Sequence, residues 1–142
     1  MQKKNVLFIC VHNSARSQMA EAFLKKLAGD QFYAESAGLE PTSVNPLVIE
    51  VMRETGIDLS EKTAQSVFDL FKKGRLFDYV ITVCDDAAED KCPLFPGICH
   101  RLHWPFPDPE HLTGTQEEKL HSLRKIRDSI RSRIEEWANA LK

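Results

Sequence analysis

The sequence predicts an α/β fold in which a parallel sheet is flanked by helices. Short apolar runs, typical of buried strands, alternate with segments whose apolar residues recur every three or four positions, as in amphipathic helices. Strands that alternate with helices are joined by crossover connections and therefore lie parallel. A length of 142 residues and an apolar content of 42% suit one domain, 1–142, with a single core.

The first half of the chain is predicted to form two strands and two helices, over residues 5–10, 16–28, 32–36 and 45–56. The first helix has its apolar face at Met19, Ala20, Phe23, Leu24 and Leu27. The second begins with Asn45 as cap and Pro46 in the first turn, and Gly56 ends it.

The second half is predicted to hold a helix over 63–73, a β-branched strand over 78–84, a weaker strand over 99–104 and a final helix. Thr115 and Glu118 form a capping-box pattern at the start of this last helix. Its apolar residues have core spacing: Leu120, Leu123, Ile126, Ile130, Ile134, Trp137 and Leu141.

The composition excludes several classes of function. A net charge of −2 argues against a broad nucleic-acid surface. The chain has no apolar run of membrane-spanning length and no signal-peptide pattern, so we expect a cytoplasmic protein. In that reducing compartment the four cysteines are expected to be catalytic, metal-binding or inert, and not structural disulfides.

The strongest functional signal is the loop that follows the first strand. Cys10 ends this strand, and Arg16 follows after five intervening residues, Val11, His12, Asn13, Ser14 and Ala15, with Ser17 directly after it. Backbone N–H groups of such a loop, the start of the next helix and the Arg16 guanidinium can together bind a tetrahedral oxyanion. The same positive field favours the Cys10 thiolate, which is the nucleophilic form. The alternative is a buried strand-end cysteine beside a surface arginine, but the strand-loop-helix context favours the oxyanion site.

Other reactive side chains follow later strands. Ligands of parallel sheets bind at the carboxyl ends of the strands, so Cys10, Cys84 and the loop after Trp104 are expected to meet at one edge. Asp108 in this loop could protonate an oxyanion leaving group, or it could be an ordinary aspartate of an Asp-Pro turn.

Three interpretations of the remaining cysteines are open. Cys99, in a strand-like stretch, fits a small buried apolar residue, whereas Cys92 has polar flanks that suggest exposure. A zinc site would use the set Cys84, Cys92, Cys99, His100 and His103, but it lacks the usual close cysteine pair. A redox pair of Cys84 and Cys92 would lie about 12 Å apart along a helix. Because a disulfide needs Cα atoms within about 7 Å, such a segment would have to unwind on oxidation.

The combination of Cys10, Arg16 and Ser17 with the late Asp108-Pro109 resembles the low-molecular-weight protein tyrosine phosphatases. The Cys84 and Cys92 pair and the run 103–109 are similar to the arsenate reductases built on that fold. The resemblance covers nearly the whole chain and implies a four-stranded parallel sheet flanked by helices.

The resemblance also implies residue roles in arsenate reduction. Cys10 would attack arsenate, Arg16 would bind it, and Asp108 would protonate the leaving oxygen. Ser17 would steady the Cys10 thiolate, and Asn13 would hold the loop. A Cys10–Cys84 disulfide would then form and pass to Cys84–Cys92. The two cysteines of this last pair are separated by seven residues, where about six are expected from the family.

Partners and cofactors are also implied. Thioredoxin is the expected reductant, although glutaredoxin with glutathione or another small thiol could serve, and phosphate or sulfate would compete with arsenate. We expect a monomer with no required cofactor. The residues matching a potassium site in some relatives are Asn13, Glu21, Ser36 and Gln65. Gln65 stands where an acidic ligand is expected, which weakens the attraction for a cation. Cys99 and His12 have no assigned role.

Two other functions compete with arsenate reduction. Phosphate-ester hydrolysis would need Cys10, Arg16 and Asp108 but not the other cysteines. The loop 110–113 has no tyrosine, whereas the resemblance implies that tyrosines here form the pocket wall of a phosphotyrosine phosphatase. A non-catalytic redox or oxyanion sensor would show thiol oxidation without turnover.

Overall fold

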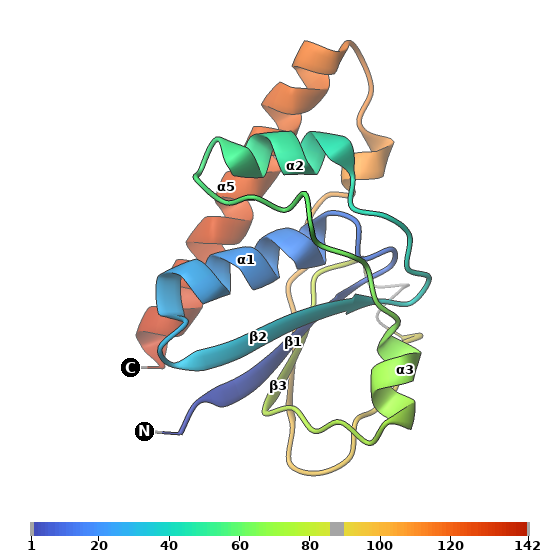
Figure 1. Cartoon of the computed structure of the whole chain (residues 1–142), viewed down its shortest axis with the longest axis vertical. Coiled ribbons are helices and arrows are strands. Elements are labelled where there is room, and N and C mark those ends of the chain that lie inside the picture. The colour runs from blue at the N-terminus through green and yellow to red at the C-terminus, as the bar shows by residue number, and fades with distance from the viewer. Residues whose placement is uncertain (1, 86–89, 142) are drawn as a thin grey trace.

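The computed structural model describes residues 2–85 and 90–141 and contains a four-stranded parallel sheet (Figure 1). The strands lie in the order β2-β1-β3-β4. They are β1 (Lys4–Cys10), β2 (Phe32–Gly38), β3 (Tyr79–Thr82) and β4 (His100–His103). The predicted fold is therefore confirmed, including the number of strands that the family resemblance implied.

The helices are α1 (Arg16–Ala28), α2 (Pro46–Arg53), α3 (Val67–Lys72), the 3-10 turn η1 (Pro109–His111) and α5 (Gln116–Ala140). Figure 1 shows α1 lying along the sheet between α2 and β2 in this view, with the long α5 crossing behind α1 and α3 set apart from all three. α1 contacts β1, β2 and α5, and its polar residues Arg16, Ser17, Gln18 and Glu21 are buried along with most of its apolar ones.

The two faces of the sheet bury separate hydrophobic clusters. Side chains of successive strand residues point to opposite faces. In β1, Val6, Phe8 and Cys10 therefore join the larger cluster with α1, α2 and α5. Leu7 and Ile9 join a smaller cluster with α3. Both faces of β1 are thus covered, as its unbroken apolar run predicts.

The predicted starts of α2 and α5 are confirmed at atomic detail. The Asn45 side chain accepts a hydrogen bond from Leu47 N at 2.9 Å, with Pro46 in the first turn of α2. Thr115 and Glu118 form a complete capping box at the start of α5. Of the predicted stripe in α5, Leu141 lies just beyond the helix and is largely exposed.

The predicted helix over 63–73 is wrong in its first four residues, because α3 begins only at Val67. Ser66 is extended, pairs with Gly38 beside β2, and caps α3 by accepting from Phe68 N. Gln65 donates and accepts hydrogen bonds outside any helix. Tertiary contacts with β2 and the Cys10 loop thus override the helical pattern of residues 63–66.

The predicted strands over 78–84 and 99–104 are shortened to β3 and β4 at both ends. The question whether residues between Cys84 and Cys92 are helical lies partly outside the described residues, because positions 86–89 are not described. Within the described ranges, 2–85 and 90–141, no helix is long and apolar enough to cross a bilayer.

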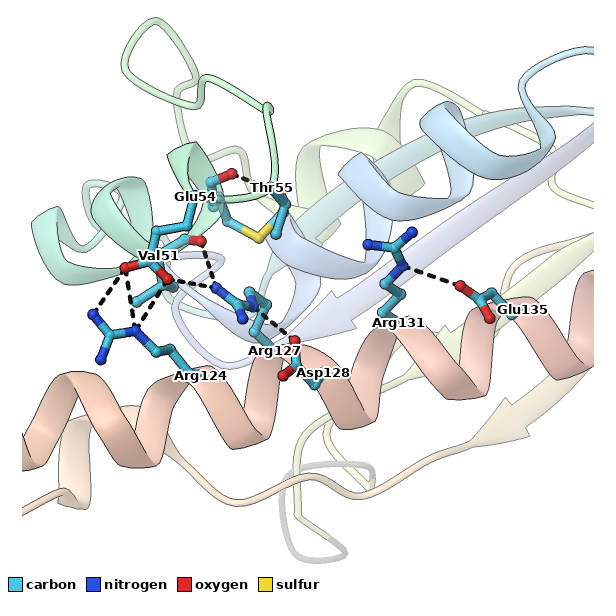
Figure 2. Close-up of polar contacts among 9 residues, drawn as sticks. Val51, Glu54, Thr55, Arg124, Arg127, Asp128, Arg131 and Glu135 are labelled. Atoms are coloured by element: carbon cyan, nitrogen blue, oxygen red, sulfur yellow. Dashed lines mark hydrogen bonds and ion pairs between the residues drawn. The ribbon is translucent and has the colours of Figure 1, made fainter.

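An ion-pair network fixes α2 to α5 (Figure 2). Glu54, directly after α2, accepts from Arg124 Nε at 3.0 Å and from Arg127 Nη1 at 2.8 Å. Arg127 also donates to the carbonyl oxygen of Val51 at 2.9 Å and to Asp128 at 2.9 Å. The arginines thereby satisfy backbone and carboxylate acceptors at the end of α2.

Candidate active site

The Cys10 loop is a tight turn between the carboxyl end of β1 and the first residue of α1. Asn13 has a positive φ of 51°, a conformation that asparagine tolerates better than most residues. Its backbone N–H donates to Cys10 Sγ at 3.2 Å. The loop therefore curls back so that a backbone donor faces the predicted nucleophile.

Gly38 at the end of β2 allows this loop to lie close to the sheet. A Cβ atom at position 38 would stand 2.8 Å from both Asn13 N and Val11 O, which is closer than real Cβ contacts. Val11 O in turn accepts from Glu40 N at 2.8 Å. The end of β2 and the segment after it thus pack against the backbone of the Cys10 loop and hold it in place.

Ser17 and Asn13 form the inner hydrogen-bond network of the site. Ser17 Oγ lies 2.9 Å from Cys10 Sγ and accepts from Asn13 Nδ2 at 2.7 Å. Both polar side chains are completely buried. Since Asn13 occupies an acceptor position of the Ser17 hydroxyl, the hydroxyl hydrogen is free to point at Cys10 sulfur. This geometry suits the thiolate-steadying role predicted for Ser17.

Arg16 and Asp108 come together from opposite halves of the chain. Arg16, only 5% exposed, donates from Nη1 to Phe106 O at 3.2 Å. Its Nη2 lies 3.8 Å from Asp108 Oδ2. Asp108 Oδ1 also accepts from Glu110 N at 2.9 Å and so caps η1. Asp108 is therefore both a turn residue and a carboxyl beside Arg16, the arginine predicted to bind the oxyanion.

The outer side of the loop contacts the same late segment. His12 Nε2 lies 3.8 Å from Glu110 Oε2, and Ser14 Oγ donates to Glu110 Oε1 at 3.5 Å. His12 Nδ1 is 3.0 Å from Glu40 O. Ala15 is buried and precedes α1. His12, which had no role from the sequence, thus lies at the rim where the two loops meet.

The predicted relay cysteines lie in different places. Cys84 is fully buried in the larger cluster that also holds Cys10. Burial raises the pKa of the Cys84 thiol to about 12, helped by Cys92 and Cys10 and opposed by the Arg16 charge. These groups therefore lie within electrostatic reach of one another, and Cys84 is a neutral thiol at neutral pH.

Cys92 is buried in the smaller cluster, although its polar flanks suggested exposure. Residues 90 and 91 are exposed, so the predicted exposure is confirmed for these flanking residues but is wrong for Cys92 itself. Cys99 is half-buried against the same cluster, just before β4. No group of three His, Cys, Asp or Glu side chains in the described ranges could hold a metal ion, zinc included.

The four residues matched to a potassium site do lie together. Ser36 Oγ donates to Glu21 Oε1 at 2.7 Å, and Gln65 Nε2 donates to Ser36 O at 2.8 Å. Gln65 N donates to Asn13 Oδ1 at 3.0 Å. However, Glu21 Oε2 already accepts from two lysine ammonium groups, and Gln65 presents a donor. The donor set therefore does not fit a bound cation.

Three residues around the loop were not predicted from the sequence: Gln18, Gly38 and Lys62. Gln18 is buried, and its Nε2 lies within hydrogen-bond distance of Asn13 O, Asn13 Oδ1 and Thr63 O. Gln18 could have been found from the sequence, because it is a polar residue beside the apolar face of the predicted first helix. Gly38 and Lys62 gave no comparable signal, because their contacts are made only across the fold.

The site geometry is that of a phosphatase-type oxyanion loop, and the comparison with protein families agrees. The model of the low molecular weight phosphotyrosine protein phosphatase family matches residues 5–142. The chain therefore belongs to this family of enzymes.

Among curated relatives, the arsenate reductase of Bacillus licheniformis is 45% identical over 139 residues, which are 97% of each chain. The arsenate reductase of Bacillus subtilis is 42% identical over the same coverage. These relatives confirm the resemblance to arsenate reductases that the cysteine pattern predicted.

Solved structures give the same result. An arsenate reductase in an oxidized state matches with a TM-score of 0.81 and 29% identity, over 98% of this chain and 99% of that one. The thioredoxin-dependent arsenate reductase of Corynebacterium glutamicum matches with a TM-score of 0.74 and 34% identity, over 97% of this chain and 61% of that one.

Proposed function

We propose that this protein reduces arsenate to arsenite through a relay of three cysteines in the cytoplasm, with thioredoxin as the final reductant. The observation that carries the proposal is the arrangement of Cys10 in an oxyanion loop with a second thiol, Cys84, buried in the same cluster. A phosphatase needs no second thiol, whereas a reductase does. The names of the relatives support the same choice.

The first step forms a covalent adduct. The Cys10 thiolate attacks arsenic, and an arsenate oxygen leaves as water after Asp108 supplies a proton. The Arg16 guanidinium and the inward N–H groups of the loop hold the remaining oxygens. Arsenic is still pentavalent in the resulting thiol–arsenate adduct, so no electrons have yet been transferred.

The second step transfers two electrons. Cys84 sulfur attacks Cys10 sulfur, and the electron pair of the sulfur–arsenic bond moves to arsenic, which leaves as trivalent arsenite. The product is a Cys10–Cys84 disulfide. Because the raised pKa keeps Cys84 neutral, it must lose its proton as it attacks, and the nearby Arg16 charge favours that loss.

The third step moves the disulfide away from the oxyanion loop. Cys92 attacks Cys84, which frees Cys10 and leaves a Cys84–Cys92 bond for a thioredoxin dithiol to reduce. Since Cys92 packs in the other cluster, it has to leave that cluster to reach Cys84. Such a rearrangement carries the bond from one face of the sheet toward the other.

The test mixes fully reduced protein with arsenate in the absence of any reductant. We expect one arsenite per chain and a Cys84–Cys92 disulfide by mass spectrometric mapping. Cys84→Ser should stop before arsenite release, whereas Cys99→Ser, the matched control, should behave as the wild type. If every thiol stays free while a phosphate ester is hydrolysed, the phosphatase function replaces the reductase function. Oxidised thiols without arsenite would indicate a sensor.

A further inference from the structure

A series of hydrogen-bonded residues, Lys62, Glu21, Ser36, Gln65, Asn13 and Ser17, connects the molecular surface with the Cys10 sulfur. At its outer end, Lys62 Nζ donates to Glu21 Oε2 at 2.6 Å. Ser36 Oγ donates to the other oxygen of Glu21 at 2.7 Å, and Ser36 O accepts from Gln65 Nε2 at 2.8 Å. Glu21 is buried on α1, while Lys62 reaches it from the segment that precedes α3.

The inner half of the path ends at the nucleophile. Gln65 N donates to Asn13 Oδ1 at 3.0 Å, and Asn13 Nδ2 donates to Ser17 Oγ at 2.7 Å. Ser17 Oγ lies 2.9 Å from Cys10 Sγ. Asn13 Oδ1 therefore accepts from Gln65, only three residues after Lys62, and also from Gln18 Nε2 on α1 at 3.1 Å.

Two lysines share the same oxygen of Glu21, but they come from different parts of the fold. Lys25 Nζ also lies 2.6 Å from Glu21 Oε2 and belongs to α1 itself, four residues on. Lys62 belongs to the segment 62–66, which lies outside any helix and pairs with Gly38 of β2 through Ser66. Lys25 thus adds charge within one helix, whereas Lys62 also ties a second segment to that helix.

The Glu21 carboxyl needs such partners, because its side chain is only 4% exposed. Burial raises the pKa of Glu21, but the hydrogen bonds from Lys25, Lys62 and Ser36 outweigh burial and leave the pKa below its usual value. With either lysine removed, the other lysine and Ser36 still bind this buried carboxylate, so the two lysines differ in the segment that each one ties to Glu21.

We propose that Lys62 is a positioning residue, a tethered cation that anchors the segment 62–66 to Glu21 and thereby fixes Asn13 against the Cys10 loop. It supplies positive charge where the family resemblance suggested a potassium ion. This inference concerns the site of the proposed function. Only one of its tests, the measurement of arsenate kcat/KM, rests on that function.

The experiment compares Lys62→Met with the conservative Lys62→Arg and with Lys25→Met as the matched control on the same oxygen. The first readout is the rate at which iodoacetamide alkylates Cys10, followed on the Cys10 peptide by mass spectrometry. We expect Lys62→Met to change this rate and to lower arsenate kcat/KM about tenfold, because a slightly displaced loop presents the nucleophile poorly. Lys62→Arg and Lys25→Met should remain within about twofold of the wild type.

Equal losses of kcat/KM in Lys62→Met and Lys25→Met would overturn the proposed tether role of Lys62, because the loss of one positive charge would then explain the effect. A Lys62→Met protein with wild-type alkylation and kcat/KM would overturn it as well. Lys62 is partly exposed, so this variant should fold, which thermal melting checks. Exchanging sodium for potassium chloride should leave the wild type unchanged, and a gain specific to potassium would overturn the tethered-cation role. The alkylation result stands even if arsenate is not the substrate.

Discussion

At the residue scale, the site depends on polar side chains that are buried and hydrogen-bonded to one another. Asn13, Ser17 and Gln18 are almost inaccessible, and each has a partner in the Cys10 loop or in α1. Buried polar groups of this kind are stable only when they are paired, so each one limits the positions of its neighbours. The loop is therefore held in shape before any oxyanion arrives, which is the condition for electrostatic preorganisation.

Gly38 has no polar side chain, but its small size is also needed for the shape of the Cys10 loop. In Gly38→Ala, the added methyl group would collide with backbone atoms of Val11 and Asn13, so the loop must shift. We expect arsenate kcat/KM to fall by about a hundredfold and stability to fall by about 1–3 kcal/mol. Steady-state kinetics and urea unfolding measure the two effects.

Gly74→Ala is the matched control for this substitution. It lies at a turn with a φ of 72° and has open space around it, so it should lose about 1 kcal/mol of stability through backbone strain. Its activity should match that of the wild type. Equal activity in Gly38→Ala and the wild type would contradict the close packing of the loop on β2.

At the element scale, the long α5 is joined to α2 both by apolar contacts and by ion pairs. Its buried stripe of leucine and isoleucine joins the larger cluster, while Arg124 and Arg127 bind Glu54 at the end of α2 (Figure 2). Because α5 also packs on α1 in the same cluster, this connection helps to confine the helix that follows the Cys10 loop. Two elements remote from the chemistry therefore help to fix its geometry.

The Glu54 network should give a pH-dependent contribution to stability. The hydrogen bond from Arg124 chiefly lowers the pKa of Glu54 from its ordinary value of 4.5. A depressed pKa stabilises the folded state above the unfolded pKa, and this contribution is lost as the pH falls through the folded value. Because Glu54 is well exposed, we expect Glu54→Gln to lower the free energy of unfolding by about 1 kcal/mol at neutral pH.

Urea unfolding at two pH values tests this prediction. The difference between Glu54→Gln and the wild type should be present at pH 7 and should disappear once the pH is well below the folded pKa. Glu135→Gln, which removes a pair within α5 only, serves as the control with a smaller loss. A difference between Glu54→Gln and the wild type that persists undiminished in acid would contradict an ionic origin.

At the scale of the whole molecule, the sheet separates two hydrophobic clusters and places the candidate relay across both. Cys10 and Cys84 lie in the larger cluster and Cys92 in the smaller one. The oxyanion loop itself is completed by residues from both halves of the chain, since Arg16 meets Phe106 and Asp108. Occupation of the loop by an anion should therefore stabilise the complete fold and not only the loop.

This linkage predicts a rise in melting temperature with sulfate or phosphate. A ligand at one hundred times its dissociation constant stabilises the folded state by about 2.7 kcal/mol. In Arg16→Lys the planar fork is lost, so the same anion concentrations should give a clearly smaller rise. Calorimetric scans at constant ionic strength measure the shift. Equal shifts in both proteins, or an equal shift with chloride alone, would contradict a specific oxyanion site.

Much of this molecule was determined by local sequence. The alternation of apolar runs with helical spacing predicts the parallel α/β fold, and the Asn45 and Thr115 caps predict where α2 and α5 begin. Cys10 and Arg16 were predicted together because the strand, the turn and the helix that bring them together are contiguous in the chain. Short-range steric and hydrogen-bonding rules are sufficient for features of this kind.

Other features were decided only by tertiary structure. The strand order, the burial of Cys92 despite its polar flanks, and the extended segment before α3 arise from contacts between residues far apart in sequence. The same is true of Lys62 on Glu21 and of Gly38 beneath the Cys10 loop. Side-chain type and spacing carry no information about which distant segment will lie alongside. Burial and packing across the sheet select that partner, and with it the side chains that surround the nucleophile.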